Sequence, residues 1–195
     1  MAQRILIIQG HPDRSKRHLC HALAQAYADG ARGAGHAVET VEPALIDFPL
    51  LRSAEEWQHG SVPAALAPVQ EQIMQATHLV LVYPLWLGEM PALLKAFLEQ
   101  VARPGFAIAA ESRNPLRAGL LGGRSARVIV TMGMPAVLYR WFYRAHSLKA
   151  LQRNILGFAG IRPVRTCVVG GAASLTPQQV ERWCAPLRRL GAAAR

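Results

Sequence analysis

The segment HLVLVYPLWLGEMPALLKAF, residues 78–97, contains the pattern that decides the fold. It begins with an apolar run, 78–83, in which polar and apolar residues do not alternate, and this indicates a strand buried on both faces. Pro84 and Gly88 mark a short turn, and apolar residues spaced three or four apart after Pro91 then predict a helix. The stretch is therefore typical of one strand–helix unit of a parallel sheet.

The same pattern recurs on both sides of this segment. Further apolar runs predict strands at 5–8, 127–131 and 164–169, and a weaker run at 36–41 is a candidate edge strand. Helical spacing falls between the strands, at residues 19–30, 69–76, 94–101, 139–158 and 176–190. Five strand–helix units with right-handed crossovers predict an α/β fold, a three-layer, doubly wound parallel sheet of five strands in one domain of residues 1–195.

Composition excludes several other classes of protein. The chain has 195 residues, of which 51% are hydrophobic and 17% charged, and this balance argues against disorder. No apolar stretch approaches the roughly 20 residues that span a membrane, and the N-terminus does not resemble a signal peptide. Cys20, Cys167 and Cys184 lack metal-binding spacing, so we expect free thiols in a reducing cytoplasm and no metal site.

The net charge of +10 comes almost entirely from arginine. A basic excess favours an anionic partner, such as a phosphate-bearing cofactor, a nucleic acid or a lipid surface. However, no run of Lys and Arg is longer than two residues, and we therefore expect neither nucleic-acid nor membrane binding.

Ligands of doubly wound sheets bind outside the carboxyl ends of the strands, so the loops at those ends are the candidate sites. The first, QGHPDRSKRH at 9–18, has Gly10 for a sharp turn and then places hydroxyl and basic groups at 15–18 before a helix. This arrangement suits an anion, although Ser15 alone also fits a helix cap. The pattern matches neither the dinucleotide-binding nor the P-loop motif.

The second and third loops carry aromatic residues. In the second, at 84–90, Trp86 lies in a short turn where it could stack on a flat ring or pack into the core. After the third, at 132–138, a single helix would place Tyr139, Tyr143 and His146 on one face. A Tyr–His pair can stabilise a developing oxyanion, or its two side chains can simply form their hydrogen bonds at an interface.

Taken together, these loops resemble those of the flavodoxin-like NAD(P)H:quinone oxidoreductase family, in particular its short bacterial members. The resemblance covers nearly the whole chain, and it implies the strand order 2-1-3-4-5. It rests on three blocks in order: His11 with Ser15; YPLWLGEMPALLKAFLEQV (83–101) with RPGFAI (103–108); and TMGMP (131–135) with Tyr139, His146 and NILGFAGI (154–161).

The resemblance implies a non-covalently bound flavin, FMN or alternatively FAD, and we favour FMN because no motif would anchor an adenine. The cofactor's phosphate would lie at four residues of the first loop: His11, Ser15, Arg17 and His18. The ring would lie against residues of the other two loops: Pro84, Leu85, Trp86 and Leu87, and Thr131, Met132, Gly133 and Met134. Tyr139 and His146 would be catalytic, although His146 lies one residue further along than the family's histidine.

The implied activity is transfer of a hydride from NADH or NADPH to the flavin N5 atom and then, in a ping-pong sequence, to a quinone or similar flat electrophile. The resemblance also implies a homodimer, with 104–125 and 139–143 as candidate interface segments. Three alternatives remain open. They are a flavodoxin-like electron carrier, which would usually be acidic, a flavin-binding regulatory subunit without turnover, and a nucleic-acid binder without a cofactor.

Overall fold

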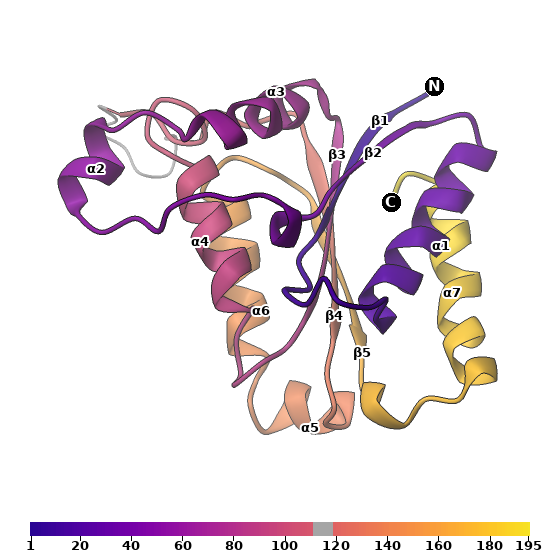
Figure 1. Ribbon diagram of the computed structural model, residues 1–195. Coiled ribbons are helices and arrows are strands. Elements are labelled where there is room, and N and C mark those ends of the chain that lie inside the picture. The colour runs from indigo at the N-terminus through magenta and orange to yellow at the C-terminus, as the bar shows by residue number, and fades with distance from the viewer. Residues whose placement is uncertain (111–118) are drawn as a thin grey trace.

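The computed structural model describes residues 1–110 and 119–195 and is organised around one five-stranded parallel sheet (Figure 1). The sheet has the order β2-β1-β3-β4-β5, as predicted. The strands are β1 (Arg4–Gln9), β2 (Ala37–Val41), β3 (His78–Pro84), β4 (Ser125–Thr131) and β5 (Val164–Val169). Their register places Ile5 of β1 beside His78 of β3, and Pro84 of β3 beside Thr131 of β4. The carboxyl ends of β3 and β4 are therefore level.

Helices cover both faces of the sheet (Figure 1). On one face α1 (Leu19–Gly33) and α7 (Pro177–Ala192) pack side by side. The other face carries α3 (Ala67–Gln75), α4 (Ala92–Val101), α6 (His146–Ala150) and a π-helical segment, Leu151–Leu156. Two short helices complete the set: α2 (Ala54–His59), which projects outward, and α5 (Ala136–Trp141), beyond the carboxyl ends of the strands. No helix among the described residues is long and apolar enough to span a membrane.

Burial follows the sequence pattern of each strand. Every residue of β3 is buried, because helices cover both sides of this central strand. Most of β2 remains accessible, as expected of an edge strand. Side chains that alternate along the inner strands thus divide between two cores, one under α1 and α7 and the other under α3, α4 and α6.

The close packing of α1 and α7 depends on glycine. A Cβ atom added to Gly30 would lie 1.9 Å from the carbonyl oxygen of Arg188, and one added to Gly191 would lie 2.1 Å from that of Tyr27. Gly30 therefore lies inside α1 at a helix contact, and α1 ends three residues later, at Gly33. This end agrees with the expectation from the sequence that the glycines at 30, 33 and 35 stop the helix. At the other end of the sequence, Thr176 caps α7, since its side chain accepts a hydrogen bond from the Gln179 N–H.

The prediction of one helix over 139–158 was wrong. The chain leaves α5 after Trp141, and Arg144 and Ala145 adopt left-handed φ angles of 50° and 49° before α6 begins. The turn is held by the Ala145 N–H, which donates to the Tyr139 carbonyl at 3.1 Å. Local spacing of apolar residues could not reveal this break, because the turn contains neither Gly nor Pro.

Candidate functional site

The largest group of predicted site residues surrounds a cavity of about 480 Å³ at the carboxyl ends of β3 and β4. We call it the ring cavity. Seven of the fourteen predicted residues line it: Leu85, Leu87, Met132, Gly133, Met134, Tyr139 and His146. Its volume lies in the range of small-molecule sites, and its walls are mainly apolar, as expected from the methionines that follow Thr131. The cavity therefore suits a flat ring system.

A tight turn after β3 forms one wall of this cavity. Trp86 and Glu89 exchange backbone hydrogen bonds of 2.9 and 3.0 Å, and the two residues between them, Leu87 and Gly88, have φ angles of 49° and 80°. A left-handed conformation costs a leucine about 1–2 kcal/mol. Leu87 is nevertheless fully exposed at the mouth of the cavity. A strained backbone at a residue whose apolar side chain is exposed is typical of a ligand-binding turn.

Unpaired backbone donors also occur among the residues that line this cavity, as far as the structure describes the chain. The N–H groups of Gly133 and Met134 form no hydrogen bond with any other residue that the structure describes. A Cβ atom added to Gly133 would meet nothing within 4 Å. This edge of the ring cavity thus combines open space with unpaired donors, an arrangement that suits the carbonyl-bearing edge of a heterocycle.

Tyr139 and His146 both reach the ring cavity, but not from one helix face as predicted. Tyr139 is buried, and its hydroxyl lies 2.8 Å from Ser147 Oγ and accepts the Leu148 N–H at 3.2 Å. His146 is exposed on the next helix. The turn between α5 and α6 therefore places both residues at the cavity. The Tyr139 hydroxyl already contacts Ser147 and the Leu148 N–H of α6.

Pro84 and Thr131 end the two central strands and lie behind the ring cavity. The Thr131 carbonyl accepts the Leu85 N–H at 2.7 Å, and its hydroxyl lies 3.3 Å from Cys20 Sγ at the start of α1. Burial raises the pKa of the Cys20 thiol to about 11, so this thiol is neutral. These contacts join Thr131 to the second loop and to the first turn of α1, so Thr131 positions its neighbours and does not itself line the cavity.

The first loop differs from its prediction in detail. Helix α1 begins at Leu19, so Ser15 does not cap it. Instead, the Ser15 N–H donates to Asp13 Oδ1 at 2.8 Å, and Asp13 Oδ2 lies 2.7 Å from His18 Nε2. Hydrogen bonds from Ser15 and then from His18 hold the pKa of Asp13 well below its usual range. An internal carboxylate thus already binds two of the four residues that were predicted to hold a phosphate, Ser15 through its N–H and His18 through its ring.

Gly10 also has a different role from the predicted one. Its φ is not positive, so it does not provide an unusual turn. A Cβ atom here would lie 2.6 Å from the Leu94 side chain of α4. Gly10 therefore allows the first loop to pass close to α4, the helix that follows the ring-cavity turn.

His11 connects the first loop to the ring-cavity turn. Its ring stacks on that of His18, with centroids 3.7 Å apart, and meets the Trp86 ring edge-on at 5.7 Å. Burial, followed by His18 and His21, lowers the pKa of His11 below its ordinary value. Trp86 itself is 49% exposed, which argues against the alternative in which it packs into the core.

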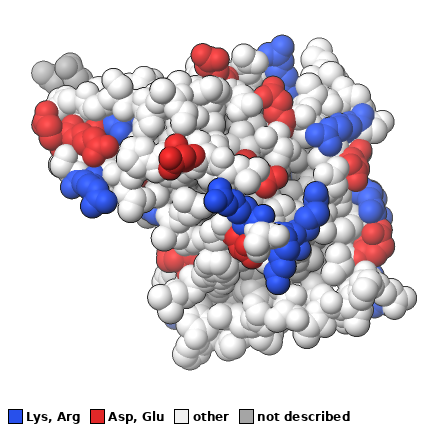
Figure 2. Space-filling view, viewed as in Figure 1, with Lys and Arg blue, Asp and Glu red and all other residues white. Residues whose placement is uncertain are grey.

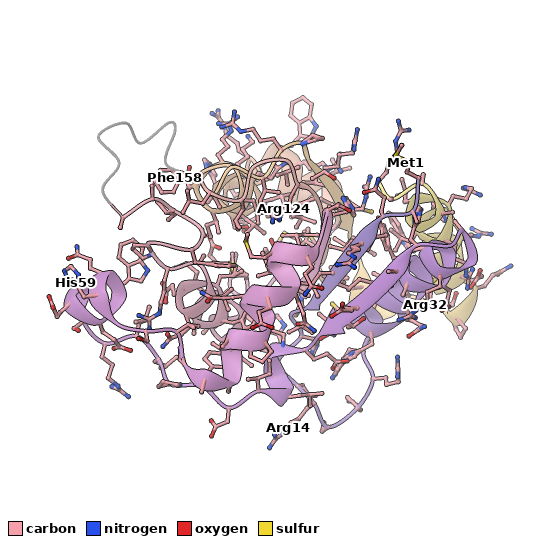
Figure 3. All side chains as sticks on the ribbon, turned by 90° about the horizontal axis from the view of Figure 1, so that it is seen from above. Met1, Arg14, Arg32, His59, Arg124 and Phe158 are labelled. Atoms are coloured by element: carbon pink, nitrogen blue, oxygen red, sulfur yellow. The ribbon has the colours of Figure 1, made fainter. Side chains whose placement is uncertain are left out.

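Charge is concentrated near this loop. Arg14, Lys16 and Arg17 are exposed. Figure 2 shows basic side chains gathered in the middle of the face where Figure 1 places the connection from β1 to α1, and Figure 3 shows Arg14 pointing outward from the rim. Nearby, the Gln9 Nε2 atom is buried and has no hydrogen-bond partner among residues 1–110 and 119–195. The positive charge and the unpaired donor both favour an anionic ligand.

Several residues of the site were not predicted. Gly88 and Ser147 also line the ring cavity, and His21 lies 6.0 Å from both His11 and His18, measured between ring centroids. Tyr143, a candidate from the third loop, lines the cavity as well. His21 follows His18 by three residues, a spacing that signals one helix face. Ser147 had no such signal, because only the unforeseen turn before α6 brings it to the cavity.

Comparison with known proteins supports this picture of the fold. Residues 3–188 match the Flavodoxin_2 family model, of flavodoxin-like fold. The chain is 31% identical to an uncharacterized NAD(P)H oxidoreductase of Haemophilus influenzae over 163 residues, which cover 82% of this chain and 79% of that protein. An FMN-dependent NADH:quinone oxidoreductase of Ruegeria pomeroyi is 34% identical over 71 residues, 36% of this chain and 34% of that one.

A solved structure agrees with the observed topology. The NAD(P)H:quinone oxidoreductase from Methanothermobacter marburgensis superposes with a TM-score of 0.81 and covers 98% of this chain and 96% of its own. Its sequence identity is 23%, so the similarity is one of fold.

Proposed function

This chain belongs to the flavodoxin-like family Flavodoxin_2 and is an oxidoreductase, and from that premise we propose that it uses FMN and NAD(P)H to reduce a quinone or a similar flat electrophile. The observation that carries the proposal is the ring cavity, where the carboxyl ends of β3 and β4 bring together seven residues predicted from the sequence. Ligands of doubly wound sheets bind at this edge.

The described residues fit FMN in two parts. The ring cavity would hold the isoalloxazine between Leu85 and Leu87 on one side and Met132 to Met134 on the other. The first loop would hold the phosphate through Ser15, Arg17 and the stacked pair His11 and His18, beside the Gln9 Nε2 atom, which has no partner among the described residues. The contact of His11 with Trp86 joins the first loop to the turn that forms one wall of the ring cavity.

When bound, FMN would accept a hydride from NAD(P)H at N5 and pass it to the acceptor that replaces the nicotinamide. The protein's contribution would be position and electrostatics. The N–H groups of Gly133 and Met134 and the His146 side chain can donate hydrogen bonds where negative charge develops. Tyr139 supports them through its buried contact with Ser147.

The proposal extends to partners and location. A set of exposed apolar side chains on α5 and the turn after it, Val137, Trp141, Phe142 and Tyr143, supports a homodimer that covers this surface. Part of the other candidate interface segment, 111–118, lies outside the described residues. The three free cysteines support a reducing compartment, and we propose the cytoplasm.

Steady-state kinetics test the proposed reaction. With purified protein, FMN, NADH or NADPH and a benzoquinone, one shared site requires the nicotinamide to leave before the quinone binds. Double-reciprocal plots at several quinone concentrations should therefore be parallel. Intersecting lines would contradict the shared site, and failure to oxidise either nicotinamide would contradict the activity itself.

A matched pair of glycine substitutions tests the ring cavity. Both Gly133 and Gly122 have room for a side chain and lack a positive φ, but only Gly133 lines the cavity. Gly133→Val should weaken FMN binding at least about tenfold by occupying the ring's space, whereas Gly122→Val should not change it. Equal FMN affinities in the two variants, measured by fluorescence quenching, would place the ring elsewhere.

A further inference from the structure

A second cavity of about 560 Å³ adjoins the ring cavity. It lies between the turn after β3, the start of α4 and the segment from Ser147 to Ile155. Leu87 and Ser147 line both cavities, so the two meet at these side chains. A ligand bound in the ring cavity would therefore have direct access to the second space.

The second cavity continues along α4 into a smaller one. Lys95 and Ile155 line both, and the smaller cavity, of about 120 Å³, ends at Trp57 and Phe158. Figure 3 shows Phe158 on the same side of the molecule as His59, at the end of α2. We call the combined space the α4 groove. It leads from the ring cavity toward α2.

One face of α4 forms a wall along the whole groove. Ala92, Lys95, Glu99 and Ala102 are spaced by three or four residues and line its successive parts. Ten residues of helix extend about 15 Å, the length of an extended chain of about a dozen carbon atoms. The opposite wall includes the π-helical segment, through Leu151 and Ile155. Such segments occur frequently at functional sites.

The chemistry of the groove selects an uncharged, apolar occupant. Among residues 1–110 and 119–195, Glu89 and Lys95 are the only ionisable residues that line the larger cavity, and both are exposed. Lys95 is already paired with Glu99, one turn further along α4. The described lining of the groove thus offers no unpaired cation for a phosphate or a sulfonate, while Met90, Leu151 and Ile155 offer apolar surface.

We propose that the α4 groove binds the apolar tail of the electron acceptor, so that the preferred acceptor is a quinone with an isoprenoid or similar hydrocarbon chain. This inference rests on the proposed function. The quinone ring would enter the ring cavity, and its tail would pass Leu87 and Ser147 and lie along α4 toward Trp57. Burial of the tail would raise the affinity for the acceptor without changing the reaction.

A series of quinones with one ring and different tails tests this proposal. The ring 2,3-dimethoxy-5-methyl-1,4-benzoquinone is compared with its derivatives bearing one and two isoprene units, at saturating NADH or NADPH. We expect kcat/KM to rise about tenfold with each unit, a gain that corresponds to burial of roughly two methylene groups. A ten-carbon isoprenoid alcohol, which carries the tail alone, should inhibit competitively against the tailed quinone.

Two substitutions test whether the preference for tailed quinones arises in the α4 groove. Ala92 and Ala54 are both exposed first residues of helices, but only Ala92 lines the groove. Ala92→Phe should reduce the ratio of kcat/KM for tailed over tailless quinone about tenfold, and Ala54→Phe should leave this ratio unchanged.

Four results would overturn the proposal in distinguishable ways. Equal kcat/KM values across the quinone series would remove the tail preference while leaving the quinone reductase activity intact. A tail preference equally insensitive to both substitutions would place the tail elsewhere. A dimer that Ala92→Phe dissociates, without any tail preference, would assign the groove to a second copy of the chain. Finally, absence of turnover with every quinone would contradict the proposed function itself.

Discussion

Single side chains determine how the loops of the site meet. The Tyr139 hydroxyl joins α5 to α6 through Ser147 and the Leu148 N–H. The His11 ring joins the first loop to Trp86, and the Thr131 hydroxyl lies against Cys20. None of these contacts follows from spacing along the chain, because each joins residues from different elements. Sequence reasoning therefore found the residue types of the site more readily than their partners.

Tyr139→Phe should loosen the turn that completes the ring cavity. The substitution leaves the buried Leu148 N–H without its acceptor, and such a loss costs about 1–3 kcal/mol. We expect the free energy of unfolding in urea to fall by that amount and FMN affinity to fall with it. Tyr143→Phe is the control, because Tyr143 is exposed. Equal stabilities of the two variants would show that the buried hydroxyl does not hold the turn.

His78 should make the protein sensitive to acid. Burial, followed by Arg127 and Arg165, lowers its pKa to about 4. Its Nδ1 atom contacts Ser125, its ring stacks on Tyr27, and its Nε2 atom has no partner in the described part of the chain. Because the unfolded chain binds the proton near pH 6.5, the neutral His78 contributes stability above that pH, which is lost as the pH falls toward 4.

Between pH 7 and pH 5 this loss amounts to about 2 kcal/mol. His78→Phe, which keeps an aromatic ring against Tyr27, should therefore reduce the difference in unfolding free energy between these two pH values by about that amount. His59→Phe, at an exposed position on α2, should not. Urea denaturation at both pH values makes the comparison, and an undiminished difference in His78→Phe would place the acid sensitivity in other groups.

At the scale of elements, the strands were the most predictable part of the molecule. Three of them, β1, β3 and β4, are apolar runs buried inside the sheet, and the exposed edge strand β2 was recognised by its interrupted run. The run that predicted β5 forms the other edge, where only Val168 and Val169 are fully buried. The prediction of one helix over 139–158 was wrong, because the left-handed turn at Arg144 and Ala145 is stabilised by hydrogen bonds to the buried Tyr139, which the local sequence does not reveal. Helix α2 was missed, since its exposed residues have no apolar stripe.

The contact between α1 and α7 can be tested at two glycines of one helix. Gly30→Ala would place a methyl group 1.9 Å from the Arg188 carbonyl oxygen, whereas a methyl group at Gly33 would meet nothing within 4 Å. We expect Gly30→Ala to lower the unfolding free energy by at least about 2 kcal/mol and Gly33→Ala to leave it unchanged or raise it slightly. Thermal unfolding followed by circular dichroism would measure both. Similar melting temperatures would contradict the close packing.

At the scale of the whole molecule, the carboxyl ends of β3 and β4 are level and lie next to α5 (Figure 1). The exposed side chains of α5 and of the turn after it form an apolar surface there. If a second copy covers this surface, Phe142→Glu should convert dimers into monomers, because burial of an unpaired carboxylate in an interface has a large desolvation cost. Leu50→Glu, at an exposed position away from α5, is the control. Sedimentation equilibrium decides between the outcomes, and a wild-type monomer would contradict the proposed dimer.

The central claim is that the three loops together bind FMN. Identification of the chromophore tests it most directly: the protein is purified, its visible spectrum is recorded, and any pigment released by heat is identified by mass spectrometry. We predict a yellow protein that absorbs near 450 nm and releases one FMN per chain. A colourless protein that neither retains a flavin nor binds added FMN would contradict the account.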